Sequence, residues 1–136
     1  MEKEKKVALM AQAREARKKA IAPYSSFSVG AALLTADGKI VTGCNIENAA
    51  YSVCCCAERV ALFKALSEGE RDFCAIAVCG GRDEEVSCPP CGVCRQALAE
   101  YTDTERFMVY TMEHDEVIGM TLSEYLPKSF SKKELK

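Results

Sequence analysis

Two short motifs contain residues that could bind a metal ion and move protons. The first is Cys56-Ala57-Glu58, and the second is Pro90-Cys91-Gly92-Val93-Cys94, with 32 residues between Glu58 and Cys91. Two cysteines three positions apart at a helix start can clamp one tetrahedral ion, and Cys56 can add a third sulfur. Three protein ligands leave one position for water, which is typical of catalytic zinc. Glu58, two residues after a ligand, can reach that water without binding the metal.

Both motifs lie at the predicted starts of helices, which cover residues 56–67 and 92–101. The free N–H groups and partial positive charge of a helix N-terminus favour thiolate, the form of cysteine that binds metal. Three thiolates on Zn²⁺ leave a formal charge of −1, which nearby cations could offset. Arg59 and Arg95 are the candidates, and each could equally be an ordinary surface or helix-capping residue.

The remaining elements must bring these two helix starts together. An amphipathic helix is predicted over residues 3–21, ended by Pro23, and a hairpin of strands 28–35 and 39–43 turns at Asp37-Gly38. A buried strand over 73–80 precedes a polar loop over 82–90. Short strands at 106–111 and 116–119 and a helical turn at 122–126 complete the order. This order predicts a layered α/β domain with a mixed sheet.

The chain has nine cysteines, one histidine and no tryptophan. A secreted disulfide framework is disfavoured, because the number is odd, three cysteines are consecutive and the N-terminus has no apolar signal segment. We therefore expect a cytosolic protein with reduced thiols. Cys44, Cys74 and Cys79 are predicted to be small core hydrophobes, and His114 is expected on a solvated turn.

Other cysteine arrangements remain open at this stage. Cys88 forms a second C-x-x-C with Cys91, so it is either a decoy or a fourth ligand. A structural four-cysteine zinc site could use Cys55 or Cys88. A thioredoxin-like redox pair is disfavoured, because no βαβ pattern precedes the C-x-x-C. Only Cys56 of the run Cys54-Cys55-Cys56 has the C-x-E spacing to Glu58.

Length and charge exclude several classes of protein. The 136 residues, 14.9 kDa, fit a single domain over residues 1–136, with no linker or internal repeat. A formal net charge of −2 excludes a strongly basic nucleic-acid binder, and 49% hydrophobic residues exclude a disordered chain. No segment approaches the roughly 18 apolar residues of a membrane span. We expect neither nucleic acid nor membrane as a partner.

Taken in order, the motifs resemble the small, homotetrameric, zinc-dependent cytidine deaminases. C-x-E followed by P-C-x-x-C is the signature of the wider deaminase superfamily, in its three-cysteine form. The resemblance runs from about Ala22 to Phe130. Its segments are APYS at 22–25, FSVGAA at 27–32, GCNIENAAY at 43–51, CAER at 56–59, PCGVCRQ at 90–96 and Leu126-Pro127.

The resemblance implies a three-layer α/β/α sandwich with a mixed sheet of about five strands. It also implies a role for each matching residue. By this resemblance Cys56, Cys91 and Cys94 hold one Zn²⁺ per subunit, Glu58 shuttles protons and Arg59 compensates the thiolate charge. Asn45 and Glu47 would bind the ribose hydroxyls, and Phe27 and the backbone of Ala57 would contact the pyrimidine. Tyr51 and Phe130 would lie near sites shared between subunits. The loop before Cys91 departs from the family pattern, since it is longer and carries Cys88.

The implied reaction is hydrolytic deamination of cytidine and deoxycytidine in pyrimidine salvage, with release of ammonia. Blasticidin-type deaminases share the size and zinc motif, but the pair Asn45 and Glu47 within the NIENAAY segment at 45–51 favours a nucleoside. Polynucleotide editing is disfavoured, because no basic stripe with interleaved aromatics is present. A nucleotide substrate is disfavoured because Glu47 is a poor neighbour for a phosphate. A zinc-stabilised binding module is the alternative outside the enzyme class.

Overall fold

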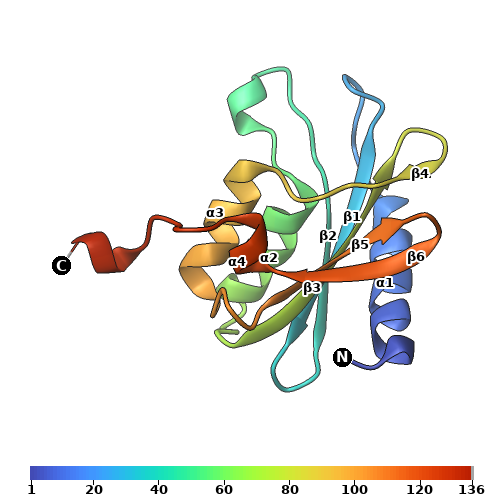
Figure 1. Cartoon of the computed structure of the whole chain (residues 1–136). Coiled ribbons are helices and arrows are strands. Elements are labelled where there is room, and N and C mark those ends of the chain that lie inside the picture. Colours follow the sequence, from blue (N-terminus) through green and yellow to red (C-terminus); the bar gives the residue numbers. More distant parts are fainter. Residues whose placement is uncertain (136) are drawn as a thin grey trace.

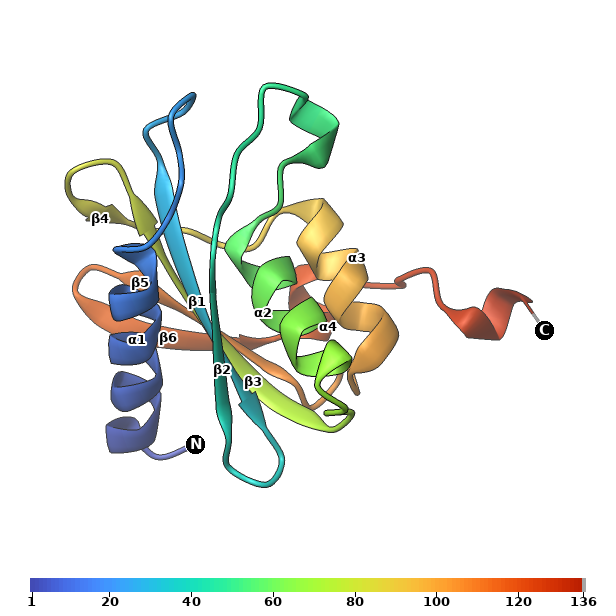
Figure 2. The same cartoon turned by 180° about the vertical axis from the view of Figure 1, so that it is seen from behind.

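The structure, a computed structural model, describes residues 1–135 (Figures 1 and 2). In chain order its helices and strands are α1 (Lys3–Arg17), β1 (Ser28–Thr35), β2 (Ile40–Cys44), the short 3-10 helix η1 (Tyr51–Val53), α2 (Ala57–Ser67), β3 (Phe73–Gly81), β4 (Glu85–Val86), α3 (Gly92–Tyr101), β5 (Met108–Glu113), β6 (Glu116–Thr121), α4 (Leu122–Tyr125) and η2 (Lys132–Leu135).

Six strands form one mixed sheet in the described part of the chain. The order is β2-β1-β3-β5-β6, with β4 paired to β3 beside this path. The pairing of β3 with β5 is parallel, and all other pairings are antiparallel. The prediction of a mixed α/β fold is confirmed. The sixth strand is β4, which lies inside the segment predicted as polar loop, and two residues are too few to produce a visible alternation.

Helices cover both faces of this sheet, which confirms the three-layer prediction (Figures 1 and 2). On one face α1 packs Leu9, Met10 and Ala13 against small side chains of β1 and β3. On the other face α2 and α3 pack against the alternate positions of the same strands, among them Ala31 and Leu33 of β1. Because side chains alternate along a strand, β1 contributes to both cores.

The first helix ends earlier than predicted. The sequence indicates a helix up to Ile21, stopped by Pro23, but α1 ends at Arg17. Ile21 instead forms a parallel bridge to Ile46. Its N–H donates to the carbonyl of Asn45 at 3.0 Å, and its carbonyl accepts from the N–H of residue 47 at 2.8 Å. This tertiary pairing requires extended backbone at Ile21, so the helix cannot continue.

The other predicted elements lie within two residues of the observed ones. They are the hairpin, the helices at 57–67 and 92–101, the strand at 73–81, the last two strands and the turn at 122–125. In the described residues no helix combines the length and the apolar character that crossing a membrane would require.

Helix α2 packs closely against β2 at Gly43, where the absence of a side chain leaves room for the helix backbone. A Cβ atom built on Gly43 would lie 2.5 Å from the backbone nitrogen of Ala61 and 2.6 Å from the carbonyl oxygen of Ala57. These are backbone atoms of α2, so the helix itself would have to move. Since α2 begins directly after Cys56, this packing sets the position of one predicted metal ligand.

Replacing Gly43 with alanine should therefore lower the free energy of unfolding by about 1–3 kcal/mol, because overpacking forces backbone shifts. Urea or thermal unfolding measures this loss. Gly92→Ala is the matched control, because a Cβ there meets nothing within 4 Å and alanine favours helix. Equal stability of the Gly43→Ala and Gly92→Ala proteins would contradict the close approach of α2.

Candidate metal centre and active site

Three cysteine sulfurs meet where α2 and α3 begin. Cys56 is the N-cap residue of α2, Cys91 is the N-cap residue of α3, and Cys94 lies in the first turn of α3. The sulfur of Cys91 is 3.7 Å from that of Cys56 and 3.4 Å from that of Cys94. All three sulfurs lie within 4.8 Å of one another.

Local backbone geometry explains why these sulfurs face one point. Both N-cap residues have extended backbone, which lets their side chains turn back toward the open N–H groups of the helix. The sulfur of Cys91 accepts the N–H of Cys94 at 3.4 Å. The thiol of Cys94 and the guanidinium of Arg59 both stabilise a negative charge on the sulfur of Cys56. The pKa of Cys56 falls to about 5, first through a hydrogen bond from Cys94, then through Arg59 and Cys91, against the opposing effect of burial.

The donor set fits zinc. Sulfurs placed 2.3 Å from a tetrahedral Zn²⁺ lie about 3.8 Å apart, close to the two sulfur–sulfur distances of this cluster. Thiolates are ligands that zinc prefers, and three of them leave one position open. Within residues 1–135 no fourth histidine, cysteine or carboxylate belongs to the group. The arrangement therefore matches a catalytic zinc site in which Cys56, Cys91 and Cys94 would hold the ion.

The three cysteines that competed for this assignment lie elsewhere. The sulfur of Cys54 accepts the N–H of Asn48 at 3.2 Å, and the backbone of Cys55 pairs with Ile46. Cys88 packs toward β3, where a Cβ on Gly80 would lie 2.6 Å from its sulfur. Burial, with the charges of Glu58 and Cys56, raises the pKa of Cys88 to about 12, so it stays a neutral thiol beside the cluster.

The cysteines predicted to be core residues behave differently from one another. Cys79 is buried, but its thiol also donates to the carboxylate of Glu85 at 2.6 Å. Cys44 is half-buried. Cys74 is exposed, so its prediction is wrong. It lies near the beginning of β3, where the burial of that strand is still incomplete. His114 is exposed on the turn between β5 and β6, as predicted.

Glu58 is the buried acid of the site. It lies in the first turn of α2, and only 4% of its surface is exposed. Burial disfavours the carboxylate, and the charge of Cys56 adds to this effect, so the pKa of Glu58 rises to about 7. A carboxyl group with a pKa near neutrality can both accept and donate a proton under working conditions.

Of the two candidate arginines, Arg59 contacts a cluster sulfur. Its Nη2 lies 3.6 Å from the sulfur of Cys56, and its Nε is buried without a hydrogen-bond partner in the described structure. The hydrogen bond to Cys56 raises the pKa of Arg59. Arg95 turns toward the protein instead, because its side chain donates to the carbonyls of Pro90 at 2.7 Å and Tyr125 at 2.8 Å. Arg95 therefore ties the ligand loop to α4.

Asn45 and Glu47 hold the loop that leads into β1. The side-chain amide of Asn45 donates to the carbonyl of Phe27 and accepts the N–H of Val29, both at 2.8 Å. The carboxylate of Glu47 accepts hydrogen bonds from the N–H of Tyr24 at 2.9 Å and from both the N–H and the hydroxyl of Ser25. The Ser25 hydroxyl is the main cause that lowers the pKa of Glu47. A carboxylate has about four acceptor positions, so Glu47 retains capacity for a ligand.

The remaining predicted site residues differ in how much of their surface is exposed to solvent. Ala57 is fully buried at the first position of α2, and Phe27 is half-buried just before β1. Tyr51 is 71% exposed, and its ring meets that of Tyr24 edge-on at 6.0 Å. Phe130 is 57% exposed, and its carbonyl accepts a hydrogen bond from Gln96.

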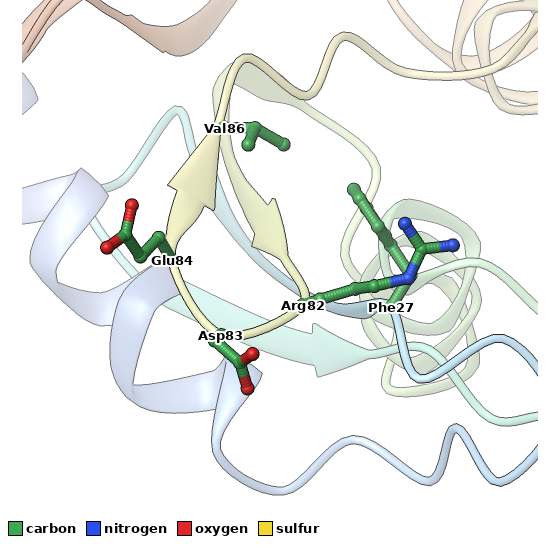
Figure 3. Close-up of a pocket in the computed structure, with 5 residues that line it drawn as sticks. All are labelled: Phe27, Arg82, Asp83, Glu84 and Val86. Atoms are coloured by element: carbon green, nitrogen blue, oxygen red, sulfur yellow. The ribbon is translucent and has the colours of Figure 1, made fainter.

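One residue near the site escaped sequence reasoning. Arg82 lies in the predicted polar loop, yet its guanidinium carbon is 6.0 Å from the centre of the Phe27 ring. Figure 3 shows the two side chains next to each other in a pocket of about 360 Å³ that Asp83, Glu84 and Val86 also line. No motif marks Arg82, because only the fold brings the β3–β4 turn to the start of β1.

Comparisons with known proteins agree with this site. The family model described as the cytidine and deoxycytidylate deaminase zinc-binding region matches residues 3–111. A cytidine deaminase of Sporosarcina psychrophila is 47% identical over 127 residues, which cover 93% of this chain and 92% of that protein. A blasticidin-S deaminase of Bacillus cereus is 32% identical over 110 residues, which cover 76% of this chain and 77% of that protein.

Solved structures give the same result. The crystal structure of a cytidine deaminase from Burkholderia pseudomallei matches with a TM-score of 0.83 at 46% sequence identity. The match covers 91% of this chain and 98% of that one. The similarity thus includes both helix starts that carry the cysteine cluster.

Proposed function

The chain belongs to the family of cytidine and deoxycytidylate deaminases with a zinc-binding region, and we propose that it deaminates cytidine and 2′-deoxycytidine hydrolytically to uridine and 2′-deoxyuridine. The observation that carries this proposal is the three-sulfur cluster with Glu58 buried beside it. The enzyme is then a zinc hydrolase that cleaves a C–N bond of a cyclic amidine and releases ammonia.

In the proposed mechanism Glu58 moves the protons. Cys56, Cys91 and Cys94 would hold the zinc, and a zinc ion held there would lower the pKa of the water that attacks the substrate. Glu58 takes a proton from that water and delivers it to N3 of the ring, which makes C4 more electrophilic. The water oxygen then attacks C4. Glu58 then takes the remaining proton from the hydroxyl now on C4 and passes it to the amino group, and the C4–N bond breaks to release ammonia.

The loops around the cluster are proposed to bind the nucleoside. Asn45 and Glu47 would hydrogen-bond the ribose hydroxyls, while the ring of Phe27 and the backbone of Ala57 would contact the pyrimidine. Support comes from the ionised state of Glu47, since its low pKa keeps a hydrogen-bond acceptor available. The ring of Phe27 lines a pocket together with Arg82, Asp83, Glu84 and Val86, so it is accessible to a ligand.

We also propose a homotetramer whose active sites are shared between subunits. Tyr51 and Phe130 are mostly exposed in the single chain, so both side chains are accessible to a neighbouring subunit. In the tetramer they would complete the site of a neighbouring subunit. Sedimentation of the zinc-loaded protein tests the assembly, and a monomer with full activity would contradict it.

The proposal includes one deaminase domain over residues 1–136, because a single sheet links elements from both ends of the described chain. It also places the protein in the cytoplasm. The support is chemical, since three cysteines must stay reduced to bind zinc. Neither a nucleic acid nor a membrane is a partner in this proposal.

An ultraviolet assay of base turnover tests the function directly. The zinc-loaded protein should convert cytidine and deoxycytidine, and should leave their monophosphates and blasticidin S largely unchanged. Preferred turnover of blasticidin S would assign the chain to that branch of the family. Bound zinc with no turnover of any of these compounds would instead favour a zinc-stabilised binding module.

Replacing Arg59 with glutamine is predicted to lower kcat/KM about 10- to 100-fold, the usual effect of removing a group that supports metal ligands. The guanidinium offsets the thiolate charge at Cys56, and without it the sulfurs hold protons more tightly and zinc less tightly. Kinetics on cytidine, with zinc retention against a chelator, measures both effects. Arg106→Gln removes an exposed arginine and is the control. Unchanged zinc retention and activity in the Arg59→Gln protein would contradict this role.

A further inference from the structure

The turn between β3 and β4 is a hairpin that α1 holds in place. Its strands pair Gly80 with Val86 and Gly81 with Glu85. Arg14 of α1 donates to the carboxylate of Glu85 at 2.5 Å. The hairpin is therefore anchored at its returning strand by an ion pair from a different layer of the fold.

A second arginine of α1 fixes the backbone at the turn itself. Arg17 donates to the carbonyl of Gly81 at 2.8 Å and to that of Arg82 at 2.9 Å. Its Nε also donates to the carbonyl of Ser28, the first residue of β1, at 3.0 Å. One guanidinium thus links the hairpin to the segment that carries Phe27, and the backbone of Arg82 is held relative to it.

From this backbone the side chain of Arg82 reaches the predicted substrate-binding residues. Its guanidinium carbon lies 6.0 Å from the centre of the Phe27 ring, and its Nε donates to the carbonyl of Ser25 at 3.3 Å. The hydroxyl of Ser25 donates to Glu47. In Figure 3 the carboxylates of Asp83 and Glu84, on the same turn, point away from Phe27.

We propose that Arg82 is a positioning residue for substrate binding, which holds the Phe27 ring and the Ser25 carbonyl together so that the pyrimidine and ribose contacts are presented as one surface. This inference rests on the proposed function, in which Phe27 packs against the base and Glu47 binds the sugar. A cation over an aromatic ring within about 6 Å attracts its face, which gives Arg82 a direct hold on the ring.

The Phe27 ring also lies close to strand β3. A Cβ built on Gly80 would lie 3.1 Å from Cε1 of Phe27 and 2.6 Å from the sulfur of Cys88, so the ring edge rests close to the β3 backbone. Arg82 is the exposed and movable contact of the ring. Without the Arg82 side chain the Phe27 ring gains conformational freedom, and this freedom must be lost again when the substrate binds. The entropy cost weakens the binding of the substrate and of the transition state equally.

The test is steady-state kinetics on cytidine with the zinc-loaded full chain. Arg82→Gln should raise KM about two- to fivefold with kcat unchanged, the size of an exposed cation–aromatic contact. Arg82→Lys keeps a cation and should recover part of this loss. Arg106→Gln makes the same substitution at an exposed arginine that pairs with Asp103 and does not line the Phe27 pocket, and it should leave both constants at the parent values.

A double variant separates positioning from a general effect of charge. In a Phe27→Leu background, Arg82→Gln should raise KM by less than it does in the parent, because the contact with the ring is already absent and only the hydrogen bond to Ser25 remains to be lost. An unchanged KM in Arg82→Gln, a loss of kcat alone, or additive losses in the double variant would each overturn the inference while cytidine turnover by the parent still supports the proposed function. A parent protein without cytidine turnover would overturn both.

Discussion

Replacing Glu58 with glutamine is expected to lower kcat for cytidine by about 10²- to 10⁴-fold, the range that general acid–base catalysis contributes. Zinc content should stay at the parent level, because Glu58 is not a ligand and the three sulfurs remain. Glutamine has nearly the same shape and can still form hydrogen bonds. It cannot accept a proton from water and return it to the ring, so the loss falls on the chemical step.

The position of Glu58 gives the physical basis of this expectation. The side chain is almost completely buried, and burial raises its pKa to about 7. At neutral pH both protonation states are therefore populated, as a residue that alternately accepts and donates requires. Metal analysis beside the ultraviolet assay separates catalysis from zinc loss. Near-normal turnover by a zinc-loaded Glu58→Gln protein would refute the mechanism.

The same burial predicts a stability effect in the metal-free protein. The pKa of Glu58 is about 7 in the folded state, against an ordinary value of 4.5. Between these values the folded protein binds more protons than the unfolded one, so this group lowers stability as pH rises through that window. The Glu58→Gln protein lacks the effect. Urea unfolding should therefore show the variant gaining stability relative to the parent between about pH 4.5 and about pH 7, with a constant difference at higher pH.

Replacing Cys94 with serine should abolish both zinc binding and turnover. Cys94 is fully buried in the first turn of α3, and its sulfur lies 3.4 Å from that of Cys91. A serine hydroxyl is a poor zinc ligand at neutral pH, since metal binding requires the deprotonated group. Two remaining thiolates cannot complete the site. Zinc per chain, measured with activity after gel filtration, should fall to background.

Zinc that binds only the folded state also stabilises it, so the Cys94→Ser protein should no longer lose thermal stability when a chelator is added. Cys88→Ala is the matched control, because Cys88 lies beside the cluster but outside it. That variant should keep its zinc. Zinc retained by Cys94→Ser, or lost by Cys88→Ala, would show that a different set of sulfurs binds the ion.

Local sequence patterns predicted the elements that carry the cysteines. The apolar run of 73–80 and the helical composition of 56–67 and 92–101 correspond to β3, α2 and α3 within one residue. These segments are long enough for their composition to identify them, with a continuous apolar run in β3 and a glycine at position 69 shortly after α2. Local sequence patterns predicted the structure less well where a segment is defined by backbone pairing with a distant part of the chain. The bridge of Ile21 to Ile46 shortened α1, and β4 formed within a segment that reads as polar loop.

Residue identity and spacing by themselves determined the chemistry of this protein. One histidine and nine cysteines leave sulfur as the metal ligand, and the C-x-E and P-C-x-x-C spacings single out Cys56, Glu58, Cys91 and Cys94. These properties are local, because a helix start places a residue and its third neighbour together whatever the rest of the chain does.

Only the tertiary structure decided between residues that look equivalent in the sequence. Arg59 and Arg95 each lie beside a predicted ligand, yet Arg59 faces Cys56 and Arg95 faces the carbonyls of Pro90 and Tyr125. Cys88 shares the C-x-x-C spacing but packs toward β3. Arg82 reaches Phe27 from 55 positions away along the chain. Such contacts depend on how separate elements pack across the sheet, and spacing along the chain contains no information about them.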